Sequence, residues 1–320
     1  MNILILTEGG KKIGFGHITR CIALYEAFEE KGINPELLVN GDSDILNLLR
    51  HKNFQRFDWI KDDKRLFEII ENSSFVVIDS YLAEKSLYDK ISEVTDGKIL
   101  MIDDYNRIDY PKGILLNPSI YGDKLDYLRK NDAIYLLGKD YIILRKEFWN
   151  VPNKKINKEI KDVLVTFGGI PKYDFTKKIV NLIKEKTYYE LHVIGTRNNK
   201  LSAKEMLNLM LKADVCISGG GQTTYELARV GVPTIGICFA ENQLVNLSGL
   251  EKVGFLKFAG WPNDRNLLQK IKDNINELNH GSRLKVYEIG RKFVDGQGAR
   301  RIIEEILKNK KIKNYLLYRK

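Results

Sequence analysis

The stretch at residues 14–21, GFGHITRC, constrains the fold of this chain more than any other. It follows an apolar run at residues 2–7, which we expect to form a buried strand. Helical spacing begins at residue 22 and runs to residue 32. A strand, a glycine loop and a helix in this order open a doubly wound α/β domain, in which the helix N-terminus points toward a ligand above the strand ends.

Three residues of this stretch are candidate binding or catalytic groups. Gly14 and Gly16 lack a Cβ atom, so the backbone can approach a phosphate closely. His17 lies in the expected first turn, where the helix dipole disfavours a positive charge by roughly 0.3–1 kcal/mol. We therefore expect His17 to be neutral near about pH 7 and ready to accept a proton.

Each of these residues also has a purely structural interpretation. The glycines could simply turn the chain, and His17 could be an ordinary first-turn residue. The spacing G-x-G-H-x-x-R, which adds Arg20, is more demanding than a lone glycine pair. It favours a functional role for the stretch.

The length and composition are those of a globular protein with about two domains: 320 residues, 43% hydrophobic and 29% charged. No apolar run approaches the roughly 20 residues that cross a bilayer, and the first residues show no signal-peptide pattern. We expect a cytoplasmic protein without stable membrane insertion. Cys21, Cys216 and Cys238 lie singly in apolar segments, which predicts buried thiols rather than disulfides or a zinc site.

The net charge of +10 raises the question of nucleic acid as a partner. The lysines are spread along the chain without a recognisable nucleic-acid-binding motif, so we expect no such partner. The densest basic patch is the tail at residues 308–320. We expect a frayed terminus there, with contact to a membrane surface or a protein partner as the alternative.

Short apolar runs alternate with helical stretches, which predicts parallel sheets covered on both faces. The pattern pauses at residues 146–159, an expected linker, and then restarts. We therefore predict two Rossmann-like doubly wound domains facing across a cleft, at residues 1–150 and 158–307. The further strands that we expect are residues 36–40, 54–57, 75–79, 98–104, 113–118, 162–167, 190–194, 214–218 and 233–238.

A second glycine loop, at residues 218–222, repeats the arrangement of the first. Gly219, Gly220 and Gly221 free backbone N–H groups for an anion, and Thr223 or Thr224 can add a hydroxyl donor. This loop is the second candidate binding element.

Polar side chains near this loop could contact a nucleotide sugar. Glu226 lies one helical turn after Gln222, within reach of both hydroxyls of a ribose if a phosphate binds at the helix start. A surface glutamate is the alternative. Asn242 and Gln243 open another helix and could orient sugar hydroxyls or amides, or merely cap that helix.

Carboxylates end two strands near the first loop. Asp79, Asp103 and Asp104 could bind a divalent metal. We expect instead that they cap helices or hold loops. Tyr81 could line the cleft or pack in the core.

Several short motifs occur along the chain in a fixed order. They are Gly14-x-Gly16-His17-x-x-Arg20-Cys21, Asp79-Ser80-Tyr81, Ile102-Asp103-Asp104, Gly138-x-x-Tyr141-x-x-Leu144-Arg145-x-x-Phe148, Thr166-Phe167-Gly168-Gly169, Ser218-Gly219-Gly220-Gly221, Glu226-Leu227, Glu241-Asn242-Gln243 and Asp295-Gly296-x-Gly298-Ala299-x-Arg301-Ile302. In this order they resemble the pseudaminic-acid pathway UDP-sugar hydrolases and their spore-coat-polysaccharide relatives. The resemblance extends from the first strand to about residue 307.

The resemblance implies the B-type glycosyltransferase fold, as in the peptidoglycan N-acetylglucosaminyltransferase. It implies release of UDP from UDP-2,4-diacetamido-2,4,6-trideoxy-β-L-altropyranose by water attack at the anomeric carbon, with inversion and without a metal or cofactor. His17 matches the residue implicated as the base. The substrate-binding residues that we expect are Gly14, Gly16, Arg20, Tyr81, Gly168, Gly169, Gly219, Gly220, Gly221, Gln222, Thr223, Glu226, Asn242 and Gln243.

The chain departs from the family where residues 170–173 separate Gly169 from Asp174, because the family often has an aspartate within two residues. Two other functions fit the same residues. One is a glycosyltransferase, with an acceptor hydroxyl in place of water, and the other is a non-catalytic nucleotide-sugar binding protein. The sequence leaves the oligomeric state and the sugar open.

Overall fold

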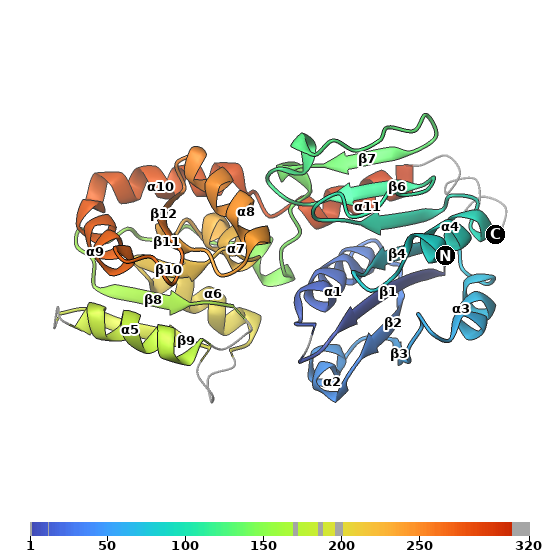
Figure 1. The fold of residues 1–320 in the computed structure, drawn as a ribbon, viewed down its shortest axis with the longest axis horizontal. Helices are drawn as coiled ribbons and strands as arrows, with labels where there is room; N and C mark the ends of the chain where they lie inside the picture. Colours follow the sequence, from blue (N-terminus) through green and yellow to red (C-terminus); the bar gives the residue numbers. More distant parts are fainter. Residues whose placement is uncertain (1, 12, 169–171, 185–187, 196–200, 309–320) are drawn as a thin grey trace. The chain divides into compact units, whose positions relative to one another are not determined.

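The computed structural model describes residues 2–11, 13–168, 172–184, 188–195 and 201–308, and it divides into two compact units (Figure 1). One unit comprises Met1–Arg145 and Gln297–Lys320, and the other comprises Lys146–Gly296. The expected division into 1–150 and 158–307 differs from this, because the last described helix packs with the first unit. No helix in the described part of the chain is long and apolar enough to span a bilayer.

The described residues of the first unit form a seven-stranded parallel sheet with the order β3-β2-β1-β4-β5-β6-β7. The edge strand β7 was not predicted, because it is only four residues long and gives a weak apolar signal; three of its residues are exposed or half-buried. The strands are β1 (Ile3–Gly9), β2 (Glu36–Gly41), β3 (Phe54–Arg56), β4 (Phe75–Asp79), β5 (Ile99–Ile102), β6 (Ile114–Asn117) and β7 (Ile134–Leu137).

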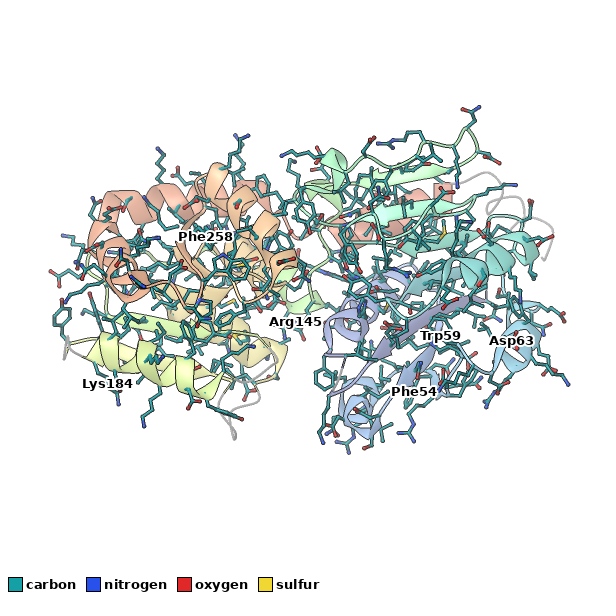
Figure 2. All side chains as sticks on the ribbon, in the orientation of Figure 1. Phe54, Trp59, Asp63, Arg145, Lys184 and Phe258 are labelled. Carbon is teal, nitrogen blue, oxygen red and sulfur yellow. The ribbon has the colours of Figure 1, made fainter. Side chains whose placement is uncertain are left out.

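Helices cover both faces of this sheet. On one face, Leu66 of α3 and Tyr88 of α4 share a core cluster with Leu4 of β1. The fully buried Trp59 adds an indole N–H bond of 2.9 Å to the carbonyl of Thr7 (Figure 2). Helices α1 and α11 pack on each other. The helices are α1 (Gly16–Glu29), α2 (Leu46–Leu49), α3 (Asp63–Ile70), α4 (Lys85–Val94) and α11 (Gly298–Lys308).

The second unit has a five-stranded parallel sheet in its described residues, with the order β12-β11-β10-β8-β9. Strand β12 was not predicted. The strands are β8 (Asp162–Thr166), β9 (Glu190–Ile194), β10 (Val215–Gly219), β11 (Thr234–Ile237) and β12 (Leu256–Gly260). The helices are α5 (Tyr173–Lys184), α6 (Ala203–Lys212), α7 (Thr223–Val230), α8 (Glu241–Lys252), α9 (Leu267–Glu277) and α10 (His280–Phe293).

Both sheets have the doubly wound topology expected from the sequence. The order of strands reverses between β1 and β4 in the first sheet and between β8 and β10 in the second. Ligands of such sheets bind at this switch point, outside the carboxyl ends of the strands. The loop after β1 and the loop after β10, which are the two glycine loops, both lie there.

The expected linker at residues 146–159 belongs to the second unit and packs onto it. Lys154 is 7% exposed, and its ammonium group donates to the carbonyl of Leu211 at 2.5 Å. Asn157 donates to Asp214 at 3.0 Å.

In the first unit, Arg300 of α11 forms an ion pair with Glu30 at 2.7 Å.

Helix α11 docks on the first unit through a glycine that leaves no room for a side chain. A Cβ atom on Gly298 would lie 2.1 Å from the carbonyl oxygen of Ile142. We predict that Gly298→Ala lowers the free energy of unfolding of the first unit by about 1–3 kcal/mol, as overpacking usually does. Urea unfolding measures it.

The matched control is Gly281→Ala in α10, where the Cβ atom would approach no atom closer than 3.5 Å. A helical glycine-to-alanine change of this kind stabilises by about 0.5–1 kcal/mol. Equal stability of the two variants would contradict the tight docking of α11.

Candidate active site

The residues around the candidate catalytic base of the first unit come from three neighbouring strand ends. His17 lies in the first turn of α1, soon after β1, and Asp79 is the last residue of β4. Asp104 follows β5. Because β1, β4 and β5 are adjacent and parallel, their carboxyl ends bring these distant residues together.

His17 and Asp79 form a hydrogen-bonded pair. Nδ1 of His17 lies 2.6 Å from Oδ1 of Asp79, and the two side chains are 9% and 0% exposed. An ionised carboxylate can only accept, so Nδ1 carries the proton and a neutral His17 presents a lone pair on Nε2. Nε2 has no hydrogen-bond partner among the described residues. The pair has the arrangement of a general base oriented by a carboxylate.

Arg20 joins this pair to a second carboxylate. Its Nε and Nη2 donate to the two oxygens of Asp79, each at 2.7 Å. Its Nη1 and Nη2 donate to Asp104 at 2.7 and 3.1 Å. Two bidentate ion pairs therefore fix the guanidinium group and hold the ends of β4 and β5 together. Arg20, an expected substrate contact, is also a structural bridge.

The electrostatics of His17 differ from the expectation. Burial lowers the pKa of His17, but the charge and hydrogen bond of Asp79 raise it by more, so the pKa lies above its usual 6.5. Burial raises the pKa of Asp79, but Arg20 and His17 hold it far below its usual range. The expected lowering of the His17 pKa by the helix dipole is not observed, because a hydrogen-bonded carboxylate outweighs a dipole contribution of about 0.3–1 kcal/mol.

Tyr81 lies beside His17, and a residue that the sequence analysis missed holds it there. The rings of Tyr81 and His17 meet edge-on with centroids 4.4 Å apart, and the Tyr81 hydroxyl donates to Asp104. Glu8 of β1 is fully buried and accepts from the backbone N–H of Tyr81 at 2.7 Å and from the hydroxyl of Ser80. The sequence signal that could have identified Glu8 is an acidic residue at the end of an apolar strand.

Gly14 lies in the loop between β1 and α1, and Gly16 is the first residue of α1. Gly14 has a φ of +90°, which favours glycine, and it pairs with Gly10 through two backbone hydrogen bonds of 2.9 and 2.7 Å. A Cβ atom on Gly14 or Gly16 would meet nothing within 4 Å. The loop therefore borders open space beside the start of α1, as close approach of a ligand requires.

The second glycine loop lies between β10 and α7. Gly219 ends β10, and α7 begins at Thr223. A Cβ atom on Gly220 would lie 2.7 Å from Leu247, whereas one on Gly221 would meet nothing within 4 Å. Gly220 is thus required by packing, and Gly221 borders open space.

Amide side chains of α8 brace this loop. Oε1 of Gln243 accepts from the backbone N–H groups of Gly220 and Phe239, at 3.2 and 3.1 Å. Nδ2 of Asn246 donates to the carbonyl of Gly220 at 2.7 Å and to the hydroxyl of Thr224 at 2.9 Å. Gln243, expected as a sugar contact, uses its carbonyl oxygen to hold the loop, and Asn246 was not predicted.

The remaining expected residues of this loop differ in exposure. The buried hydroxyl of Thr224 donates to the carbonyl of Gly221 at 2.7 Å, whereas Thr223 is half-buried. Glu226 is 3% exposed, one turn into α7. Asn242 is exposed in the first turn of α8.

Two glycines were expected after β8. Gly168 has a φ of +83°, and a Cβ atom there would meet nothing within 4 Å. Gly169 lies outside the described residues, as does the basic tail beyond Lys308. Gln222 is exposed just before α7.

One group of possible metal ligands occurs among the described residues, and it lies far from the glycine loops in the topology. Asp162, Glu190 and His192 place one ligand atom each within 4.8 Å of one another, at the amino ends of β8 and β9. The Lys212 ammonium group lies 3.0 Å from Asp162 and 2.8 Å from Glu190. We interpret the group as an ion-pair network, because the Lys212 ammonium group already pairs with both carboxylates.

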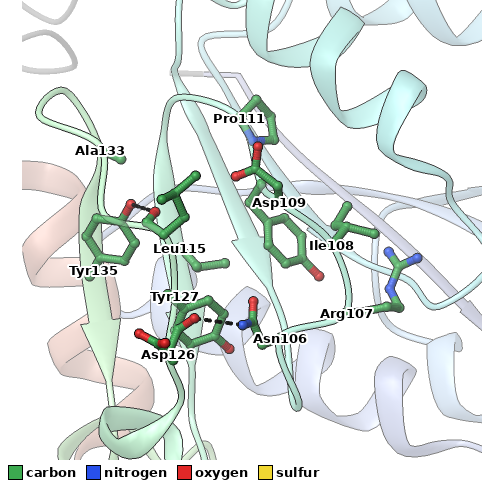
Figure 3. Close-up of a pocket in the computed structure, with 12 residues that line it drawn as sticks. Asn106, Arg107, Ile108, Asp109, Pro111, Leu115, Asp126, Tyr127, Ala133 and Tyr135 are labelled. Carbon is green, nitrogen blue, oxygen red and sulfur yellow. Dashed lines mark hydrogen bonds between the residues drawn. The ribbon is translucent and has the colours of Figure 1, made fainter.

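A pocket of about 300 Å³ opens between the β5–β6 and β6–β7 loops (Figure 3). None of the predicted site residues lines it. Asp103, expected to hold a loop, accepts from the hydroxyls of Tyr110, at 2.9 Å, and Tyr127 in the pocket wall. The pocket lies beside the candidate site. Its lining residues are Asn106, Arg107, Ile108, Asp109, Tyr110, Pro111, Leu115, Asp126, Tyr127, Leu128, Ala133 and Tyr135.

No protein-family model matches the chain. It is 25% identical to the Helicobacter pylori pseudaminic acid cytidylyltransferase and UDP-2,4-diacetamido-2,4,6-trideoxy-beta-L-altropyranose hydrolase, over 80% of this chain and 48% of that protein. It is 23% identical to the Campylobacter jejuni UDP-2,4-diacetamido-2,4,6-trideoxy-beta-L-altropyranose hydrolase, over 80% of this chain and 98% of that protein. It is 25% identical to the Bacillus subtilis spore coat polysaccharide biosynthesis protein SpsG, over 94% of this chain and 96% of that protein.

The predicted family resemblance is thereby confirmed. The chain spans about half the length of the Helicobacter pylori protein and of an uncharacterized Methanocaldococcus jannaschii protein, of which it matches 55%. The structure of Acinetobacter baumannii MurG is similar, with a TM-score of 0.67 over 96% of this chain and 99% of that one, at 12% identity. This similarity confirms the B-type glycosyltransferase-like fold.

The ion pair of His17 and Asp79 makes the stability of the first unit depend on pH. Because the folded-state pKa of His17 is raised, its contribution is full below 6.5 and is lost as the pH rises through the folded value. We predict that the stability advantage of the wild type over His17→Gln, which keeps an N–H donor, is larger at about pH 5.5 than at about pH 9. Urea midpoints measure it, and an advantage that grows with pH would contradict the pairing.

Proposed function

We propose that this protein is a hydrolase that releases UDP from a UDP-linked diacetamido-trideoxy sugar, by attack of water at the anomeric carbon with inversion. The observation that carries the proposal is the His17–Asp79 pair at the switch point of the first sheet. The similarity to two proteins named as UDP-sugar hydrolases supports this substrate class. The proposed enzyme acts in the cytoplasm and uses no metal or cofactor.

His17 takes a proton from the attacking water. Its Nε2 is the acceptor, because Nδ1 is bound to Asp79. Asp79 fixes the ring orientation and stabilises the imidazolium that forms. A general base in this position typically contributes roughly 10²–10⁴-fold in rate.

UDP binds to the loops of the second unit. Gly221 and Gly168 border open space beside strand ends, and backbone N–H groups at the start of α7 suit a diphosphate. Thr223 adds a hydroxyl donor, and Glu226 accepts from the ribose hydroxyls. The same N–H groups stabilise the charge that develops on departing UDP, which is usually the larger part of catalysis.

A glycosyltransferase is the second candidate, because the fold is similar to that of MurG. In that reaction His17 would take the proton of an acceptor hydroxyl instead of water. Saturable stimulation of UDP release by a glycan or lipid acceptor would favour it over hydrolysis.

The test is phosphorus NMR of the protein with UDP-2,4-diacetamido-2,4,6-trideoxy-β-L-altropyranose in ¹⁸O-labelled water. Hydrolysis at the anomeric carbon leaves the label in the free sugar, and UDP carries none. We expect His17→Ala to lose about 10²–10⁴-fold in turnover while UDP affinity stays the same. His51→Ala, which removes an exposed histidine of the same unit, is the control.

Three outcomes would contradict parts of this proposal. Label in UDP would mean that water attacks phosphorus, which gives His17 no role as the base. Equal losses of turnover and UDP affinity in His17→Ala would make His17 a ligand contact. Binding without any turnover would favour a non-catalytic nucleotide-sugar binding protein.

A comparison of two nucleotides tests the ribose contact of Glu226. We predict that Glu226→Gln weakens binding of UDP by about tenfold or more, since a hydrogen bond to a charged group contributes about 1.5–3 kcal/mol. Binding of 2′,3′-dideoxy-UDP should be the same in both proteins, and calorimetry measures each affinity. Glu241→Gln, at an exposed position of α8, is the control. Equal weakening for both nucleotides would exclude the ribose contact.

A further inference from the structure

Asp104 is the second carboxylate of the cluster around His17, and no motif assigned it a role in catalysis. Its side chain is 23% exposed, while that of Arg20 is 11% exposed. The Asp104 carboxylate accepts two N–H bonds from Arg20, at 2.7 and 3.1 Å, and a third bond from the Tyr81 hydroxyl. Asp104 thus contacts both side chains that flank His17.

The charges of this cluster depend on Asp104. With a neutral His17, one guanidinium and two carboxylates give a net charge of −1, from +1 for Arg20 and −2 for Asp79 and Asp104. Uptake of a proton by His17 then makes the cluster neutral. Without the charge of Asp104, the same proton would leave a net positive charge in a buried site, which is costly.

Arg20 makes this compensation necessary. Its Nη2 lies 3.4 Å from Nδ1 of His17, and its charge lowers the pKa of that residue. Arg20 also contacts both oxygens of Asp79, which weakens the pull of that carboxylate on His17. Asp104 opposes both effects, because it faces the same guanidinium group and raises the pKa of His17.

Asp104 also fixes the position of Tyr81. The hydroxyl of Tyr81 donates to Asp104, and its ring meets that of His17 in an edge-on contact. Burial and the charge of Asp104 raise the pKa of Tyr81, so its hydroxyl stays protonated. The hydrogen bond to Asp104 therefore persists while His17 gains and loses its proton.

We propose that Asp104 is a positioning residue for His17: it holds Arg20 and Tyr81 in place and supplies the negative charge that lets His17 take up a proton. The role of Asp104 in catalysis rests on the proposed hydrolase function. Its effect on proton uptake by His17 in the free protein does not depend on that function.

The other ionisable groups around His17 do not supply this charge. Cys21 of α1 faces Asp79, and burial raises its pKa, so the thiol stays neutral. Burial and Asp104 raise the pKa of Tyr121 in the same way. Glu8 of β1 is bound to Ser80 and to the backbone of the loop after β4. Among the described residues, Asp79 and Asp104 are the carboxylates that raise the pKa of His17.

The test is a direct titration of His17 in the free protein. The chain has four histidines, so ¹³C-labelled imidazole groups give few signals, and His17→Gln assigns the one of interest. We expect Asp104→Asn, which removes the charge and keeps the shape, to lower the pKa of His17 by about one unit or more. Asp104→Glu should keep the wild-type value.

Asp109→Asn is the matched control, because it removes one carboxylate from the same β5–β6 loop. Asp109 forms its ion pair with Lys130 at 2.7 Å, away from the cluster. The pKa of His17 should not change in this variant. Signals of His51, His192 and His280 at their wild-type positions establish that each variant is folded.

An unchanged or higher pKa of His17 in folded Asp104→Asn would overturn the proposal and leave Asp104 a structural role only. If that variant does not fold, Asp104→Ser removes the charge in a smaller side chain and is titrated in its place. With an active enzyme, the acidic limb of the kcat/KM profile should move down in pH by the same amount as the NMR titration. Absence of turnover would defeat the hydrolase proposal, and the titration would still decide the role of Asp104.

Discussion

The buried carboxylate of Asp79 is the interaction on which the candidate active site depends. It is fully buried at the end of a central strand, and it accepts from both His17 and Arg20. A lone buried carboxylate would be strongly destabilising, so its partners are obligatory. The same contacts that make the charge tolerable in the fold also orient the imidazole and raise its pKa. The contacts of Asp79 therefore both stabilise the fold and prepare His17 for its proposed role.

The parallel topology explains why the residues of each site could meet. Both sheets reverse their strand order at a point where a glycine loop leads into a helix. The strand runs and glycine loops are local patterns, so the sequence predicted them and the fold class. The short strands β7 and β12 and the packing of α11 depend on contacts between distant segments, which apolar patterns alone do not report.

The site shows the same limit at the level of single residues. His17 was predicted from its loop, but the direction of its pKa shift was not, because Asp79 lies 62 positions away and the strand-end aspartates were interpreted as residues that cap helices or hold loops. Glu8 and Asn246 were missed because their partners are backbone groups and hydroxyls of other segments. Gln243 was predicted as a residue of the site, but only the structure shows that its side chain contacts Gly220 and braces the loop.

The two units hold their loops with different chemistry, and the difference suits the proposed roles. Carboxylates of Asp79 and Asp104 fix the first site, so its charge is negative and favours uptake of a proton. Neutral amides of Gln243 and Asn246 fix the second glycine loop. A carboxylate in place of these amides would repel a diphosphate at the start of α7, whereas an amide braces the loop without adding charge. The choice of amide over carboxylate therefore keeps the backbone N–H groups beside Gly221 attractive to an anion.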